Sequence, residues 1–294
     1  MRYINFGSIN IDHVYAVDHF VRPGETTASS AYSKFAGGKG FNQSVALARA
    51  GAEVFHAGRI GSDGTWLRDI LVNEGVKTDF LAAGGTPTGH AVIQVDPSGQ
   101  NCIIIHGGAN REISPAAAAS AISHFGPSDG LLLQNEISSI PEIMKAASDN
   151  GLPITFNPAP MGREVLDYPL ELVKLFIVNE TEAAAICGKA ASMEKTLEMM
   201  CAKFPHAGTV ITHGDAGAMA SIDGQIAFVP ARHVPAVVDT TAAGDTFIGY
   251  LLALMGEGAS LETAMKTAAA ASAICVSRSG ASPSIPMRNE VVID

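Results

Sequence analysis

Short apolar runs alternate with helical patterns through most of the 294-residue chain, and this alternation limits the possible folds more than any other feature of the sequence. Buried strands are predicted at residues 3–7, 131–133, 154–156, 176–178 and 209–212. Helices are predicted at residues 42–50, 182–187, 196–204, 245–255 and 261–276, an apolar stripe at residues 66–71 ends at Gly75, and Ser114-Pro115 opens a further helix. The pattern predicts an α/β fold with a doubly wound, mostly parallel sheet flanked by helices.

Two segments interrupt the alternation. Residues 11–35 lack helical periodicity, and residues 91–105 predict two alternating strands around a Pro97-Ser98-Gly99 turn. We expect them to form a small β-strand lid on a single domain that spans residues 1–294. Because unpaired strand edges are a liability, such a lid either closes over a ligand or pairs with a second subunit. A homodimer formed through the lid is therefore expected.

The composition excludes some classes of partner. Apolar residues make up 47% of the chain and charged residues 16%, which permits a large core. The net charge of −10 argues against a nucleic-acid or anionic-membrane surface, since either would need a basic face. The N-terminus develops no signal-type apolar region, and no uncharged stretch approaches the ~20 apolar residues of a membrane helix. A soluble, cytoplasmic protein without nucleic-acid or membrane partners is expected.

The four cysteines are scattered along the chain at Cys102, Cys187, Cys201 and Cys275. They show neither a CxxC motif nor Cys/His spacing, so the pattern favours reduced core thiols over disulfides or a zinc site. A reducing compartment agrees with this pattern.

The first glycine cluster, Gly37-Gly38-Lys39-Gly40, lies just before Asn42 at a predicted helix start. Adjacent glycines allow the backbone to approach a ligand closely, and amides at a helix start donate to its oxygens. The cluster lacks the upstream glycine and the following hydroxyl of a Walker A loop. A plain tight turn that opens a helix remains the alternative.

The second cluster, residues 239–247, is a run of small residues before an apolar helix. It leaves the amides of Ala243, Gly244 and Asp245 at a helix N-terminus, which predicts an anion hole for a phosphoryl group. The Asp245 carboxylate would lie beside that group as a weak base, and a loose phosphoryl transition state requires only late deprotonation of the alcohol. In the alternative interpretation, Asp245 merely complements the helix dipole.

Two further motifs are ambiguous by themselves. Residues 179–182 lie at a strand-to-helix junction and are also compatible with an N-cap followed by first-turn acids. Residues 212–217 form a glycine turn after a strand, where backbone groups can meet phosphates or adenine. An ordinary connecting turn would have the same sequence.

Taken together and in order, six motifs resemble the ribokinase-like, phosphofructokinase-B type carbohydrate kinases, with the ribokinase branch nearest. The resemblance covers nearly the whole chain and rests on residues 7–12, 23–26, 37–43, 157–160, 179–182 and 239–247. It implies ATP-dependent phosphorylation of a small sugar at a primary hydroxyl, with D-ribose as the expected substrate and ATP, Mg²⁺ and K⁺ as cofactors. Other branches act on nucleosides, deoxyribose or hexose derivatives, and a catalytically silent sugar-binding regulator would share the fold.

The resemblance also implies roles for individual residues. Asp245 is the implied catalytic base, and Ala242, Ala243 and Gly244 are the implied anion hole. Sugar contacts are implied at Asn10, Asp12, Gly38, Lys39, Gly40, Asn42, Glu136 and Asp245. Nucleotide and magnesium contacts are implied at Asn179, Glu182, Thr212, His213, Gly214, Asp215, Ala216, Gly217, Gly244 and Ala269. A monovalent-cation loop is implied at Asp239, Thr241, Cys275, Arg278, Gly280 and Ser284.

The sequence departs from the family pattern at two positions. Ala269 stands where ribokinases usually place His or Asn near the adenine. His90 replaces a small apolar residue of a lid strand, where it either contacts the sugar or faces solvent. A dinucleotide-binding oxidoreductase is excluded by the lack of a G-x-G-x-x-G motif after the first strand.

Overall fold

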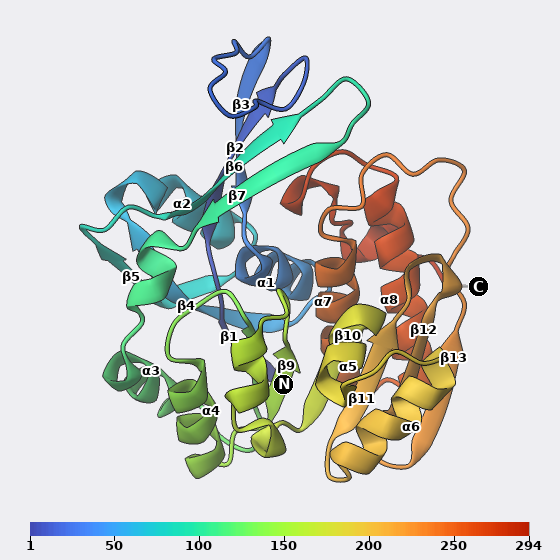
Figure 1. The fold of residues 1–294 in the computed structure, drawn as a ribbon. Helices are drawn as coiled ribbons and strands as arrows, with labels where there is room; N and C mark the ends of the chain where they lie inside the picture. The colour runs from blue at the N-terminus through green and yellow to red at the C-terminus, as the bar shows by residue number, and fades with distance from the viewer. Residues whose placement is uncertain (294) are drawn as a thin grey trace.

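The body of the protein is built on one nine-stranded sheet in the computed structural model, which describes residues 1–293 (Figure 1). The strand order is β13-β12-β11-β10-β9-β8-β1-β4-β5; the strands from β11 to β5 in this order run parallel, and β12 and β13 add an antiparallel edge. The strands are β1 (Arg2–Phe6), β4 (Glu53–Gly61), β5 (Lys77–Gly84), β8 (Gly130–Gln134), β9 (Ile154–Asn157), β10 (Leu175–Asn179), β11 (Gly208–Thr212), β12 (Ala218–Ile222) and β13 (Gln225–Val229).

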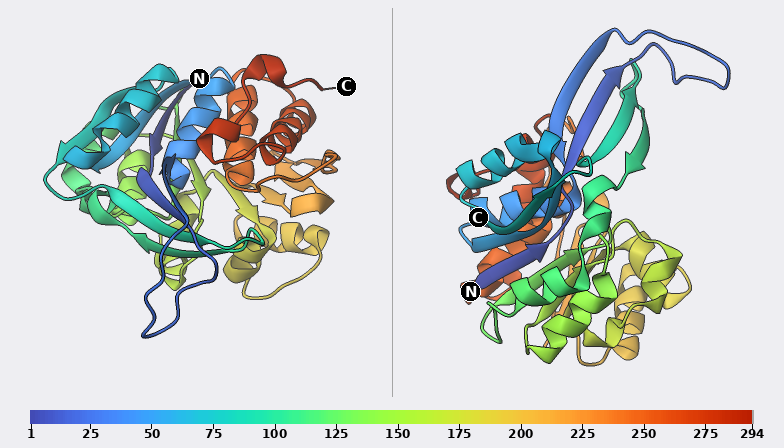
Figure 2. Two further views of the ribbon diagram at one scale, coloured as in Figure 1. Left: turned by 90° about the horizontal axis from the view of Figure 1, so that it is seen from above. Right: turned by 90° about the vertical axis from the view of Figure 1, so that its left-hand side faces the viewer.

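Helices cover both faces of this sheet (Figures 1 and 2). They are α1 (Lys39–Arg49), α2 (Thr65–Asn73), α3 (Pro115–Ile122), α4 (Ile140–Asp149), α5 (Glu180–Cys187), α6 (Met193–Lys203), α7 (Ala243–Gly256) and α8 (Leu261–Val276). Successive side chains of a strand point to opposite faces, so Leu132 joins the core under α1, α2, α7 and α8, while Leu131 and Leu133 join the core under α3 to α6. The predicted doubly wound α/β fold is confirmed.

Several elements differ from the predictions in extent. Strands β4 and β5 and helix α4 occupy segments to which the sequence pattern assigned no element. α1 begins at Lys39 and not at Asn42, because Gly38 has a φ of 93° and turns the chain directly into the helix. The expectation of core thiols fits Cys275, which is buried, but Cys102 is exposed on a lid strand.

The lid is a separate four-stranded sheet that stands out from the body (Figure 2). It has the order β3-β2-β6-β7 and consists of β2 (Asn10–Ala16), β3 (Ala31–Gly37), β6 (Gly89–Val95) and β7 (Asn101–His106). Both segments predicted to form the lid contribute strands. All six residues of β7 are exposed, and Ile104 keeps 66% of its surface accessible. Among the described residues, no helix is both long enough and apolar enough to span a bilayer.

Helices α1 and α7 touch at backbone distance, and this contact positions the first turns of both helices. A Cβ atom added at Gly249 of α7 would lie 2.4 Å from the Cβ of Ala46 and 2.7 Å from the backbone nitrogen of Leu47 in α1. Only glycine allows this approach.

We therefore predict that Gly249→Ala lowers the free energy of unfolding by about 1–3 kcal/mol, the usual cost of overpacking a filled core. Helix propensity alone would act in the opposite direction, since alanine is favoured over glycine by about 1 kcal/mol. Urea unfolding of the purified variant measures the change.

Gly244→Ala is the matched control, because it lies in the same helix and an added Cβ would meet no atom within 4 Å. Its stability should remain within about 0.5 kcal/mol of the parent. Equal stability of both variants would show that the contact between α1 and α7 tolerates a methyl group.

Candidate active site

The N-terminus of α1 lies against the link between β1 and β2. Phe41 donates its backbone N–H to the Ser8 carbonyl oxygen at 2.8 Å. A Cβ added at Gly40 would come within 2.4 Å of both the Cα of Gly7 and the backbone nitrogen of Ser8. The glycine cluster is therefore a tight turn, as its plain interpretation required, and it also buries Asn42 and leaves Lys39 partly buried.

Asp245 lies in the first turn of α7 with 7% of its surface exposed. Its Oδ2 accepts a hydrogen bond from Asn42 Nδ2 at 3.1 Å, and its Oδ1 accepts one from Gln43 Nε2 at 2.8 Å. Asn42 Oδ1 is buried and has no hydrogen-bond partner among the described residues, so it is an acceptor available to a ligand hydroxyl. Gln43 belongs to the glycine motif, but the sequence assigned it no role.

Lys39 is a partly buried cation among carboxylates. The negative charge of Asp245 raises its pKa, burial opposes that effect, and Glu136 and Glu182 add to it. Its backbone N–H also donates to Glu136 Oε2 at 2.9 Å, and the same carboxylate accepts from Ser8 Oγ. The ammonium group therefore stays charged inside the site.

Asp12 projects from lid strand β2 toward Gly37, where a Cβ would come within 2.1 Å of its Oδ2. Burial, with a smaller contribution from Glu136, raises the pKa of Asp12 to about 7. Asn10 lies on the same strand, and its Oδ1 accepts from Asn110 Nδ2 at 2.8 Å. No pattern in the sequence pointed to Asn110, which anchors the base of the lid through its hydrogen bonds to Ile9 and Asn10.

His90 faces away from Asp12. In the register of β2 against β6, Asp12 pairs with Ala91 and Ile11 pairs with His90, so the His90 side chain lies on the opposite face of the lid. There its ring lies 5.1 Å from that of His106 and 5.9 Å from that of His13. Of the two interpretations left open by the sequence, the geometry does not favour a sugar contact.

Asn179 and Glu182 form a complete capping box at the start of α5. Asn179 Oδ1 accepts from the Glu182 backbone N–H at 2.8 Å, and Glu182 Oε2 accepts from the Asn179 N–H at 3.0 Å. Burial raises the pKa of Glu182, and Lys39 partly opposes the effect. The plain N-cap interpretation is therefore correct, and Glu182 also contributes negative charge near Lys39.

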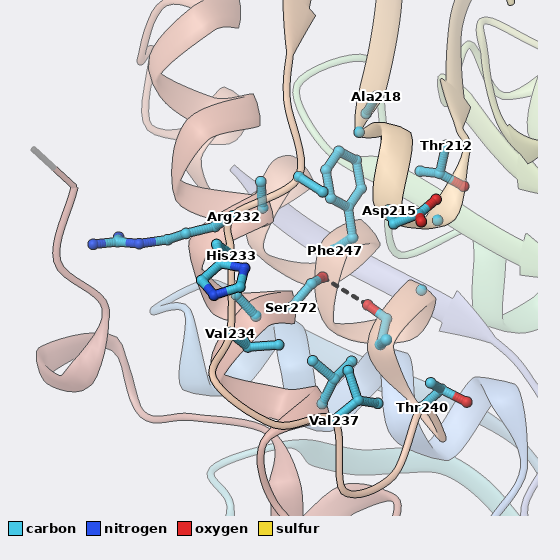
Figure 3. A pocket seen from close by; sticks show the side chains of 18 residues that line it. Thr212, Asp215, Ala218, Arg232, His233, Val234, Val237, Thr240, Phe247 and Ser272 are labelled. Carbon is cyan, nitrogen blue, oxygen red and sulfur yellow. Dashed lines mark hydrogen bonds between the residues drawn. The ribbon is translucent and has the colours of Figure 1, made fainter.

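A cavity of about 610 Å³ lies between the turn after β11 and the helices α7 and α8 (Figure 3). Of the predicted nucleotide and anion-hole residues, it is lined by Thr212, Gly214, Asp215, Gly217, Ala243, Gly244 and Ala269. The lining does not include His213, Ala216, Ala242, Asn179 or Glu182. The sequence did not point to the lining contributed by Phe247 of α7, Ser272 of α8 and residues 231–234. Residues 231–234 form an irregular loop, which carries no periodic signal.

The residues of the predicted cation loop converge, with one exception. Asp239 accepts from the backbone N–H of Thr241 at 2.9 Å and of Gly280 at 3.0 Å. Burial alone would raise the pKa of Asp239, but these hydrogen bonds outweigh it and the pKa lies below its usual value. Cys275 Sγ lies 3.0 Å from Ser284 Oγ. The exception is the side chain of Arg278, whose guanidinium pairs with Glu290 at 2.6 Å.

The described residues contain no group of three or more His, Cys, Asp or Glu side chains arranged to hold a metal ion. The loop around Asp239 nevertheless collects carboxylate, carbonyl and hydroxyl oxygens, the donor type that hard cations prefer.

Comparisons with known proteins agree with this geometry. The chain is 36% identical to the ribokinase of Haemophilus influenzae, over 97% of this chain and 95% of that protein. It is 29% identical to the deoxyribokinase of Salmonella typhi, over 95% of this chain and 94% of that protein.

Solved structures of ribokinases also match nearly the whole chain. A crystal structure of ribokinase from Cryptococcus neoformans in complex with ADP matches with a TM-score of 0.84 at 36% identity, over 98% of each chain. The structure of Arabidopsis thaliana ribokinase complexed with ribose and ATP matches with a TM-score of 0.85 at 30% identity, over 98% of this chain and 96% of that chain.

The family model for pfkB family carbohydrate kinases matches residues 3–288, which includes the glycine turn of α1, the lid strands and the start of α7. The match thus extends over the body and the lid alike. This chain belongs to the pfkB family of carbohydrate kinases, which transfer a phosphoryl group to an alcohol acceptor.

Proposed function

We propose that the chain transfers the γ-phosphoryl group of ATP to the primary hydroxyl of D-ribose, giving ribose 5-phosphate and ADP. The observation that carries the proposal is the position of Asp245. Its carboxylate is buried against the amides of Asn42 and Gln43, and it directly follows Ala243 and Gly244, which line the cavity. A base at the border between a polar sugar site and a nucleotide-sized cavity suits phosphoryl transfer.

In this mechanism the hydroxyl oxygen of the sugar attacks the γ-phosphorus. The new O–P bond forms while the bond to the β,γ-bridging oxygen breaks, and ADP leaves with the electron pair of that bond. Asp245 accepts the proton of the hydroxyl late in the step, when the oxygen has become acidic.

Two features would stabilise the charge of the transferring group. The backbone amides at the start of α7 point toward the developing negative charge, aided by the helix dipole. Lys39 supplies a partly buried positive charge that interacts with the charge of Asp245. Together they would act as a preorganised electrostatic site.

We propose that Mg²⁺ enters with ATP and that Glu182 binds it through water, because Mg²⁺ keeps several waters and needs only one or two carboxylates. When bound, Mg²⁺ neutralises phosphate charge. We further propose that K⁺ binds the loop of Asp239, Thr241, Gly280 and Ser284, whose donors are oxygens. Both carboxylate oxygens of Asp239 already accept backbone N–H groups, which hold that loop in place.

Two relatives favour D-ribose as the substrate: one is named a ribokinase, and the other was solved as a ribokinase with ribose bound. The ribokinase of H. influenzae and the ribose-bound enzyme of A. thaliana are both at least 30% identical to this chain. Deoxyribose is the second candidate, because the deoxyribokinase of S. typhi is nearly as similar at 29%. A silent sugar-binding regulator is disfavoured, since sugar binding alone needs no carboxylate beside an anion hole.

The lid supports a homodimer. Three consecutive residues of β7, Ile103, Ile104 and Ile105, are exposed at the free edge of the lid sheet. An apolar strand with an open edge favours pairing with another strand. We propose that a second copy covers it and that lid closure excludes water from the transferring phosphoryl group.

The experiment that tests the function is a coupled assay of ADP formation with ribose, 2-deoxyribose, fructose and nucleosides. Ribose should give the highest kcat/KM, and 2-deoxyribose should lose up to about 10⁴-fold if its missing hydroxyl strands a polar group of the site. A tenfold or greater preference for another acceptor would overturn ribose as the substrate and leave the family assignment intact.

We predict that Asp245→Asn lowers kcat by about 10² to 10⁴-fold, the range expected for loss of a general base. Asparagine keeps the shape of the side chain, so the thermal midpoint should change little. Stopped-flow or steady-state kinetics with the best sugar measure the loss. Retention of most of the kcat would reject Asp245 as the base.

We predict that ribose binds more tightly as the pH rises from 6 to 8. Asp12 is half protonated near pH 7 in the free protein, and hydroxyl donors favour its ionised form, so binding should release a proton. Isothermal titration calorimetry should show up to about a tenfold gain in affinity per pH unit below pH 7.

The pH dependence of folding stability that arises from Asp12 has the opposite sign to that of ribose binding. The folded-state pKa of Asp12 lies above its unfolded value, so the contribution to stability is present below about pH 4 and is lost as the pH rises through 7. Asp12→Asn should abolish both dependences. A pH-independent affinity in the unaltered protein would remove Asp12 from the sugar site.

A further inference from the structure

A continuous chain of buried side chains leads from Asp245 into the core. Gln43 Nε2 donates to Asp245 Oδ1 at 2.8 Å. Gln43 Oε1 in turn accepts from Gln134 Nε2 at 2.6 Å, and Gln134 Nε2 also donates to Asn5 Oδ1 at 2.9 Å. Gln43, Gln134 and Asn5 are fully buried, with 0% of their surface exposed. Within the described residues, the amide groups of these three side chains have hydrogen-bond partners except for Gln134 Oε1, which is buried without one.

The far end of the chain has a fixed direction. Asn5 Nδ2 donates to Ser44 Oγ at 2.9 Å, and Ser44 Oγ lies 2.8 Å from His56 Nδ1. Burial lowers the pKa of His56 to about 4, so its ring is neutral at physiological pH. The donor and acceptor roles of Ser44 Oγ and His56 Nδ1 depend on the tautomer of the ring, but Asn5 Nδ2 also donates to the Gly40 carbonyl oxygen at 2.8 Å. A carbonyl oxygen only accepts, so the orientation of the Asn5 amide is fixed and its Oδ1 faces Gln134.

Because of this chain, only one orientation of the Gln43 amide is possible. One hydrogen of Nε2 meets Asp245 Oδ1, the other meets Asn157 Oδ1 at 3.2 Å, and Oε1 meets the Gln134 amide. Rotation of the Gln43 amide by half a turn would place its Oε1 against the Asp245 carboxylate and its NH₂ group against the NH₂ group of Gln134. Both contacts would be repulsive.

We propose that Gln43 is a positioning residue for the catalytic base. It holds Asp245 Oδ1 by a donor whose orientation is set from the core, so that Oδ2, on the Asn42 side, faces the sugar hydroxyl. The inference rests on the proposed role of Asp245. Gln43 acts only through Asp245, because it is fully buried and its polar atoms are already occupied by protein groups.

Two substitutions test this role. Gln43→Met keeps the length of the side chain and removes its hydrogen bonds; we expect kcat to fall at least tenfold while KM for sugar and for ATP changes less than about threefold. Gln43→Glu keeps the shape but brings a second carboxylate into contact with Asp245. Because two touching carboxylates do not both ionise at neutral pH, the acid limb of the kcat–pH profile should move up by at least about one unit.

A double-substitution cycle separates positioning from general damage. In the Asp245→Asn background, Gln43→Met should cost less than about twofold in kcat, because the group it positions is already lost. Gln134→Met leaves Gln43 itself in place and removes the donor to Gln43 Oε1 and to Asn5 Oδ1, and it should lower kcat in the same direction. It remains informative if Gln43→Met fails to fold.

Thr209→Val is the matched control. Thr209 is fully buried in β11 and is not part of the series of hydrogen-bonded side chains that leads from Asp245 into the core. Its hydroxyl has no hydrogen-bond partner within residues 1–293. Its kcat and pH profile should equal those of the unaltered protein. This variant reports the effect of replacing a buried polar group that takes no part in the hydrogen bonds of Asp245.

The outcomes separate this inference from the proposed function. All kinetics use the sugar that the unaltered protein turns over fastest. If it turns over none, the proposed function falls and this inference falls with it. If it is active, a kcat within twofold of the parent in Gln43→Met, an unmoved acid limb in Gln43→Glu, or additive losses in the cycle would each overturn the positioning role alone.

Discussion

The close contact between α1 and α7 is the constraint on which the rest of the site depends. Gly249 allows the two helices to meet at backbone distance, and their first turns then present Asn42 and Gln43 to Asp245. A bulkier residue at the crossing would separate the amides from the carboxylate, and hydrogen bonds weaken steeply with distance and angle. Core packing and the geometry of the candidate base are therefore one property of the fold.

The electrostatics of the site follow from burying charges of both signs together. Lys39 lies close enough to Asp245, Glu136 and Glu182 for each to raise its pKa. An isolated charge at this depth would carry a large desolvation cost, and opposite charges offset it. Asp12 lacks such a cation, so burial raises its pKa to about 7. The lid side of the site thus carries a group that titrates near neutrality.

The lid uses its two faces differently. Because side chains alternate along a strand, Asn10 and Asp12 lie on one face of β2 while His13 lies on the other. The second face gathers His13, His90 and His106, away from Asp12. Moving the register by one residue would exchange the faces and would remove Asp12 from the site.

The sequence by itself determined the class of fold, the lid and the order of the motifs, because hydrophobic periodicity and glycine-rich turns are local properties of the chain. It could not assign β4, β5 or α4, whose mixed composition gives no clear period. Nor could it assign roles to Gln43, Gln134 and Asn110 or to the cavity-lining loop at residues 231–234. Such roles depend on contacts between residues far apart in sequence, such as Gln43 with Asp245 and Gln134 with Asn5. Only tertiary packing brings these partners within hydrogen-bond distance, and no local pattern records it.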